Sequence, residues 1–94
     1  MQNRDLDQLI EHAIFTTDAF VEVLTAEELP GWAARFSAIA SMLREGDIRG
    51  AVHNHSNCSY GGPGSLSDVF TKDQRQFDKA WSACGASLRA LGKA

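Results

Sequence analysis

The sequence predicts an all-α fold: a compact bundle of three longer helices plus one short helix, with a glycine-rich loop before the last helix. Apolar residues recur at steps of three or four over most of the chain, the period of an amphipathic helix. Proline and glycine fall between these periodic segments, where helices end. Alternating apolar positions around residues 65–70 are too few to support a sheet. The length of 94 residues suits one helical domain, 1–94.

The first helix is expected over residues 6–24. Asn3 or Asp5 is expected to cap its start by accepting a hydrogen bond from a backbone N–H that has no helical partner. The inner stripe consists of Leu6, Leu9, Ile10, Ala13, Ile14, Thr17, Phe20, Val21 and Leu24.

The second helix is expected over about residues 30–44. Pro30 keeps Leu29 out of the helical conformation and suits the first turn, where its missing N–H has no role. Gly46 is the expected stop because glycine accepts the left-handed conformation that closes a helix. The inner stripe consists of Trp32, Phe36, Ile39, Ala40 and Leu43.

A short third helix is expected over residues 47–55, capped by Asp47, with Ile48 and Val52 pointing inward and Gly50 weakening it. A polar loop, 53–59, is expected to follow and to overlap its end.

The last helix is expected to begin within residues 71–73, to run to about residue 91 and to end at Gly92. Its inner stripe consists of Phe77, Ala80, Trp81, Cys84, Leu88 and Leu91.

Composition excludes some classes of function. The net charge of −3, with scattered basic residues, argues against nucleic acid as a partner and suits a basic protein partner better. No apolar window of 18 residues and no secretory signal is visible, so we expect no membrane association and a cytoplasmic address. Cys58 and Cys84 are then expected to be reduced.

The segment YGGPGSLSDVF, residues 60–70, differs from the rest of the chain. Glycine loops cradle phosphate in some proteins, but this one lacks the Gly-Lys-Ser/Thr ending of a phosphate loop. We interpret it as a set of tight turns whose glycines supply unusual backbone angles and whose apolar end plugs the core. A rigid loop of this kind also presents side chains to a partner. Those side chains are Tyr60, Ser65 and Asp68.

The stretch HNHSNC supplies His53, His55 and Cys58 as candidate zinc ligands, with Cys84 or His12 as a fourth. The spacing matches no strong zinc signature, so we assign no metal and no cofactor. Serines, cysteines and histidines near residues 53–68 provide material for nucleophilic catalysis. Nothing fixes their geometry, and the chain is not expected to be an enzyme or to have catalytic residues.

Acidic residues cluster late in the first helix and in the turn after it: Asp18, Glu22, Glu27 and Glu28. Such a pattern is usual for a solvated helix face. The functional interpretation is an acidic contact surface for a basic protein. We select Asp18 and Glu22, together with the loop side chains named above, as the expected partner-binding residues.

The segment REGDIRGAVHNHSNCSYGGPGSLSDVF resembles a pattern in an uncharacterised family of small bacterial helical proteins. In that family two helices, the second with an aromatic residue near its start, lead to a Gly-Asp turn. A Gly-Gly-x-Gly-Ser-[Leu/Phe]-x-Asp motif and a final helix follow. The matching positions are Trp32, Gly46, Asp47, Gly61, Gly62, Gly64, Ser65, Leu66 and Asp68. The polar insert HNHSNC departs from the pattern.

The resemblance implies an immunity protein that neutralises a bacterial toxin by binding it directly. We therefore expect a non-enzymatic binding protein with a toxin domain as its partner. Two alternatives stay open: a small metal- or nucleotide-binding regulator, and a plain dimerising domain. The last would be favoured if Trp32 and Trp81 lay on an exposed apolar face. The oligomeric state is not predicted.

Overall fold

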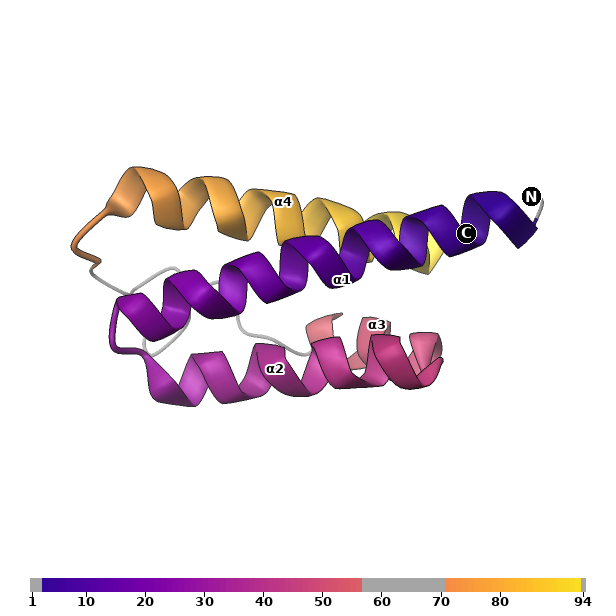
Figure 1. Ribbon diagram of the computed structural model, residues 1–94, viewed down its shortest axis with the longest axis horizontal. Coiled ribbons are helices and arrows are strands. Elements are labelled where there is room, and N and C mark those ends of the chain that lie inside the picture. The colour runs from indigo at the N-terminus through magenta and orange to yellow at the C-terminus, as the bar shows by residue number, and fades with distance from the viewer. Residues whose placement is uncertain (1–2, 57–70, 94) are drawn as a thin grey trace.

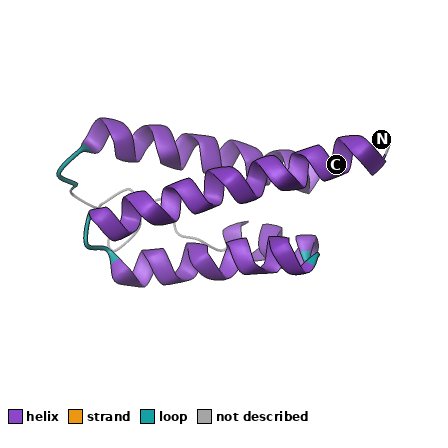
Figure 2. Cartoon of the chain, in the orientation of Figure 1, coloured by secondary structure: helices purple, strands orange, loops and turns teal. Residues whose placement is uncertain are grey.

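Four α-helices form the part of the chain that the computed structural model describes, residues 3–56 and 71–93. These residues contain no strand, and short connections join the helices at the described turns (Figure 2). The predicted all-α class, with three longer helices and one short helix, is confirmed. The predicted glycine-rich loop lies outside the described residues. The helices are α1 (Asn3–Ala26), α2 (Pro30–Glu45), α3 (Ile48–Ser56) and α4 (Gln74–Lys93).

Helix α1 is central: it packs against both α2 and α4, and α3 packs against α2 and α4 in turn. Figure 1 shows that α1 runs antiparallel to α2 and to α4. The short α3 lies beside the C-terminal part of α2. One side of α1 therefore faces the core, and its other side lies at the surface.

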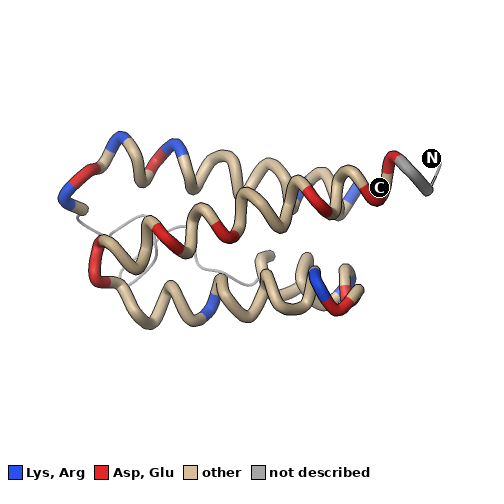
Figure 3. The backbone as a smooth tube through the Cα atoms, in the orientation of Figure 1, with Lys and Arg blue, Asp and Glu red and all other residues tan. Residues whose placement is uncertain are grey.

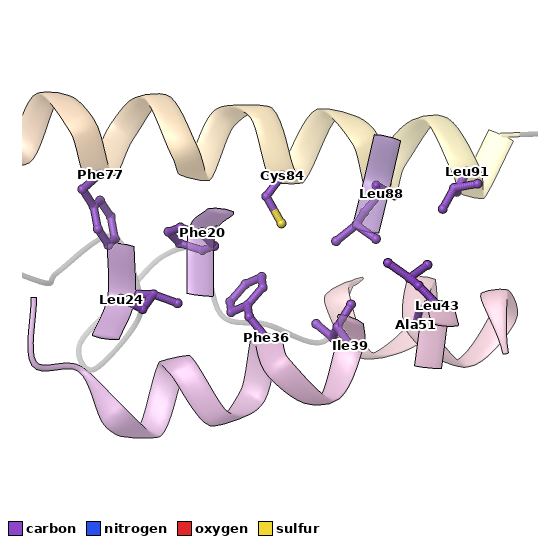
Figure 4. Packing of buried hydrophobic residues seen from close by; sticks show 11 residues of the cluster. Phe20, Leu24, Phe36, Ile39, Leu43, Ala51, Phe77, Cys84, Leu88 and Leu91 are labelled. Atoms are coloured by element: carbon purple, nitrogen blue, oxygen red, sulfur yellow. The ribbon is translucent and has the colours of Figure 1, made fainter. Parts of the chain in front are cut away.

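Three phenylalanines from three different helices meet at the centre of the core (Figure 4). The ring of Phe20 on α1 lies edge-on to Phe36 of α2 at 4.8 Å and to Phe77 of α4 at 5.5 Å, centroid to centroid. All three side chains are fully buried. Edge-to-face contacts add to the hydrophobic stabilisation of burial. The periodicity in the sequence therefore identified the residues that join α1, α2 and α4.

The ends of α2 follow the predicted local chemistry. Leu29 has φ −114° and ψ 67°, outside the helical region, as Pro30 requires. Gly46 has φ 86°, and its N–H donates to the carbonyl of Leu43. The next N–H, of Asp47, donates to the carbonyl of Met42 at 2.8 Å. This pair of bonds is a Schellman motif, which satisfies carbonyls that the helix leaves open.

The cap of α3 explains a glycine that the sequence presents as a weakness. The Asp47 carboxylate accepts the Gly50 N–H at 3.0 Å, which confirms the predicted cap. A Cβ added to Gly50 would lie 2.3 Å from the same carboxylate. Glycine at this position therefore makes room for the capping side chain.

Several predicted boundaries are wrong. Helix α3 continues to Ser56, so His53 and His55 are helical and the polar loop does not begin at residue 53. As predicted, Ile48 and Val52 face inward and pack against the core, where they are half-buried, and the more deeply buried residues of α3 are Ala51 and His55. The side-chain amide of Asn54 donates to the Gly50 carbonyl at 2.9 Å, one contact within the extended helix.

Gly92 does not end α4, which runs to Lys93. Helix α3 packs against this part of α4, and a Cβ at position 92 would lie 3.2 Å from Val52. At the same end of the molecule, where both termini lie (Figure 1), α1 includes Asn3, so Asp5 lies within the first turn and does not cap it.

Candidate functional site: a groove between α1 and α4

The acidic residues late in α1 mostly bind other parts of the chain. Asp18, a predicted partner-binding residue, forms an ion pair with Arg44 of α2, and both side chains are about half exposed. Glu28 pairs with Lys72, Oε2 to Nζ 3.3 Å. Exposed pairs of this kind contribute little to stability. They do mean that the Asp18 and Glu28 carboxylates are already paired with basic side chains of the same chain.

Glu27 holds the start of α4. Its carboxylate accepts the backbone N–H of Lys72 at 2.6 Å and of Asp73 at 2.9 Å. The Asp73 side chain in turn accepts the N–H of Gln76 at 3.1 Å. Carboxylates at a helix N-terminus satisfy open N–H groups and complement the helix dipole. The cluster that the sequence suggested as a contact surface is therefore partly a structural joint.

Glu22 differs from its acidic neighbours. Within the described residues it makes no hydrogen bond and no ion pair, and its side chain is exposed. It lines a surface groove of about 550 Å³ between α1 and α4. Of the two predicted partner-binding residues that the structure describes, Glu22 therefore belongs to a concave site and Asp18 does not. The other three, Tyr60, Ser65 and Asp68, lie outside the described residues.

The lining of this groove is rich in small apolar side chains. From α1 and the turn after it come Phe15, Thr16, Ala19, Glu22, Val23, Ala26 and Glu27. From α4 come Gln76, Lys79, Ala80 and Ala83. Phe15 is 72% exposed, the only large hydrophobic residue in the described ranges that is so open to solvent. A single exposed aromatic residue is ordinary, but Phe15 lines the groove and so extends its apolar lining into a contiguous surface, the feature that marks protein contacts.

Buried polar contacts fix the register of α1 on α4. Thr16 Oγ1 donates to Ser87 Oγ at 3.0 Å, and Thr17 Oγ1 lies 3.4 Å from Cys84 Sγ. Continuing this antiparallel register places Glu22 level with Lys79, on the opposite lip of the groove. Figure 3 shows acidic positions along the C-terminal half of α1 and both basic and acidic positions along the neighbouring stretch of α4. The charged side chain that lines the groove from α4 is Lys79, so the two lips carry opposite charges at the level of Glu22 and Lys79.

A second groove, of about 610 Å³, lies between the start of α1, α3 and the end of α4. Its lining consists of Leu6, Ile48, Arg49, Val52, His53, Ser56, Leu91 and Gly92. Arg49 and His53 are the only side chains in this lining that can carry a charge. Among the described residues, no exposed aromatic residue borders the second groove. We therefore base the candidate site on the first groove.

The candidate zinc ligands diverge. His53 is exposed while His55, two residues on along the same helix, is buried at 4% exposure. Cys84 is buried in the core beside Thr17, and His12 is exposed on α1. Cys58 lies outside the described residues. Within residues 3–56 and 71–93 no three His, Cys, Asp or Glu side chains come together as a metal site would require.

His55 belongs to the core. Its ring lies 6.4 Å from that of Phe36, in an edge-on arrangement. Burial lowers the pKa of His55 below the ordinary value of 6.5, and the nearby Arg89 guanidinium lowers this pKa further. The neutral imidazole is therefore the form that the fold favours.

The tryptophans do not form an exposed apolar face. Trp32 and Trp81 are both half-buried and pack against the core. The Arg35 guanidinium lies over the Trp32 ring at 5.4 Å, and Phe77 lies edge-on to Trp81 at 5.7 Å. The condition that would have favoured a dimer through the tryptophans is not met.

Sequence reasoning missed Phe15 and Lys79. Phe15 lies off the inner stripe of α1, and an aromatic residue outside that stripe was the available signal. Lys79 carries no such signal, because its role depends on which helix lies opposite.

Comparisons of the chain with protein-family models, curated protein sequences and solved structures found no match. None of the described helices has the length and apolar character needed to cross a membrane.

Proposed function

We propose that this chain is a non-enzymatic protein-binding domain whose contact surface is the groove between α1 and α4. One observation carries the proposal: the exposed Phe15 borders an alanine-rich groove whose lips hold Glu22 and Lys79. Binding energy at protein interfaces concentrates on aromatic anchors and neighbouring small pockets, with charged groups at the rim.

The specific form of the proposal is an immunity protein that neutralises a toxin domain. Its support is the motif resemblance in the sequence together with the acidic net charge of −3, which favours approach of a basic partner. The mechanism is occlusion. The bound chain covers the toxin's active site or blocks its access to a target, and no chemistry by the chain itself is needed.

Neutralisation tests this proposal directly. A toxin domain encoded beside the gene is expressed with or without the chain, and growth is measured. We expect the wild-type chain to restore growth and Phe15→Ala to restore it less well. Gln8→Ala, an exposed α1 position outside the groove lining, is the matched control and should behave as wild type.

Two results would contradict the proposal. Phe15→Ala that neutralises as well as the wild-type chain would remove the groove from the mechanism. Turnover of a substrate by the purified chain would remove the non-enzymatic class.

A further inference from the structure

The groove between α1 and α4 is complementary to itself. We propose that it is an interface between two copies of this chain, related by a two-fold axis that runs along the groove. This inference rests on the proposed function, since it takes the groove as a protein-contact surface. A second copy in the groove would compete with a toxin domain for it, so the dimer is the form that the chain adopts without a foreign partner.

The charges on the two lips carry the argument. A two-fold axis parallel to the helices places α1 of each copy over α4 of the other, at the same level. Glu22 of one copy then faces Lys79 of the second copy, and symmetry repeats the contact. An axis across the helices at the middle of the groove would instead bring Glu22 near Glu22 and Lys79 near Lys79. Only the first arrangement pairs opposite charges.

The shapes of the side chains agree with the same axis. Phe15 projects from α1 at one end of the groove, and the α4 lip at that end carries Ala83. In the register set by the Thr16–Ser87 contact, the two-fold rotation places Ala19 of one copy level with Ala83 of the second copy. Phe15, one turn earlier on α1, lies level with the exposed Ala86, so a large side chain meets a small one. Ala19 and Ala80 continue the line of small residues. Short side chains let helices approach closely, so the two pairs of helices form a second packed layer.

The surface is also fixed in advance. The Thr16–Ser87 contact at 3.0 Å and the Thr17–Cys84 contact at 3.4 Å hold α1 and α4 in one register. All four side chains are buried, and Thr16 also lines the groove. A surface that is ordered before association loses less conformational entropy on binding.

Charge reversal tests the proposed two-fold arrangement in five samples, the wild-type chain included. Sedimentation equilibrium of the purified chain, over roughly micromolar to millimolar concentrations, measures the dimer dissociation constant. Glu22→Lys and Lys79→Glu each place like charges in both symmetric contacts, so each should weaken the dimer about tenfold or more. An equimolar mixture of the two variants restores opposite charges in both contacts and should associate like wild type. Glu11→Lys, exposed on α1 outside the groove lining, is the charge-matched control and should leave the dimer intact.

Phe15→Ala provides a test without a charge change. Phe15 is 72% exposed, so its truncation should spare the fold, which circular dichroism checks. We expect it to weaken the dimer as well.

The outcomes separate this inference from the proposed function. A chain that stays monomeric at all concentrations overturns the dimer. Neutralisation that still depends on Phe15 would then leave the proposed function standing with a foreign partner. A dimer that is insensitive to all three groove variants overturns the interface. Charge variants that do not associate when mixed overturn the two-fold axis along the groove.

Discussion

The Glu27 carboxylate, in the turn after α1, accepts the backbone N–H of Asp73 at 2.9 Å, immediately before α4 begins. The same carboxylate accepts the Lys72 N–H. We expect Glu27→Ala to lower the free energy of unfolding by about 1–2 kcal/mol, because two N–H groups lose a charged acceptor. Urea denaturation measures the change. Glu11→Ala, at an exposed position of α1 without such contacts, should change it by less than about 0.5 kcal/mol.

Gly50 should resist replacement by alanine although it lies in a helix. Alanine is the better helix former by about 1 kcal/mol, but its Cβ would meet the Asp47 carboxylate that caps α3. We expect Gly50→Ala to give no net gain in unfolding free energy, because displacing the cap costs about as much, roughly 1 kcal/mol, as the helix propensity of alanine returns. In an Asp47→Ala background, where no cap remains to be displaced, the same change should stabilise by about 1 kcal/mol, a coupling that a double-mutant cycle measures. Gly31→Ala, where a Cβ meets nothing within 4 Å, is the control and should not destabilise.

Two phenylalanines on α1 allow a matched comparison. Phe20 is fully buried among aromatic rings, and Phe15 is 72% exposed. Phe20→Leu should cost about 1–2 kcal/mol of unfolding free energy, because it removes ring contacts and leaves a space. Phe15→Leu should stay within about 0.5 kcal/mol. Thermal or urea unfolding at a single low concentration checks both. Equal losses would show that Phe15 packs as a core residue.

His55 should make stability depend on pH. Its pKa is lower in the folded protein than the ordinary 6.5, so the unfolded chain binds more protons as the pH falls through 6.5. The stabilisation from the neutral ring is therefore present above pH 6.5 and is lost between that value and the lower folded pKa. Urea midpoints measured from pH 7.5 to pH 5 should fall in the wild-type chain.

Two histidine variants separate the contribution of His55 to this pH dependence from that of other groups. His55→Leu should flatten the decline, whereas the exposed His12→Gln should keep it. A decline that is unchanged in His55→Leu would assign the pH dependence to other groups.

Local patterns were enough to predict the helices and most of the core. Pro30 and Gly46 act on their own backbone and neighbours, so their effects are readable without a fold. The contact between Thr16 and Ser87 is different, because the two residues are 71 positions apart in the sequence and meet only in the register of α1 on α4. The burial of His55 and the role of Lys79 likewise follow from which helix lies opposite. The groove is lined by residues of both α1 and α4, so it exists only in the folded arrangement of the two helices and leaves no pattern in either segment alone.

The long separation between α1 and α4 has a consequence for folding kinetics. Helices α1 and α2 are joined by three residues, 27–29, so their antiparallel pairing closes a short loop. Joining the end of α1 to the start of α4 through Glu27 and Lys72 closes a loop of 45 residues and costs more chain entropy. We expect the α1–α2 hairpin to form in the transition state and α4 to dock later. The hairpin turn carries Glu27, so the first segment to fold already presents the group that receives the last helix.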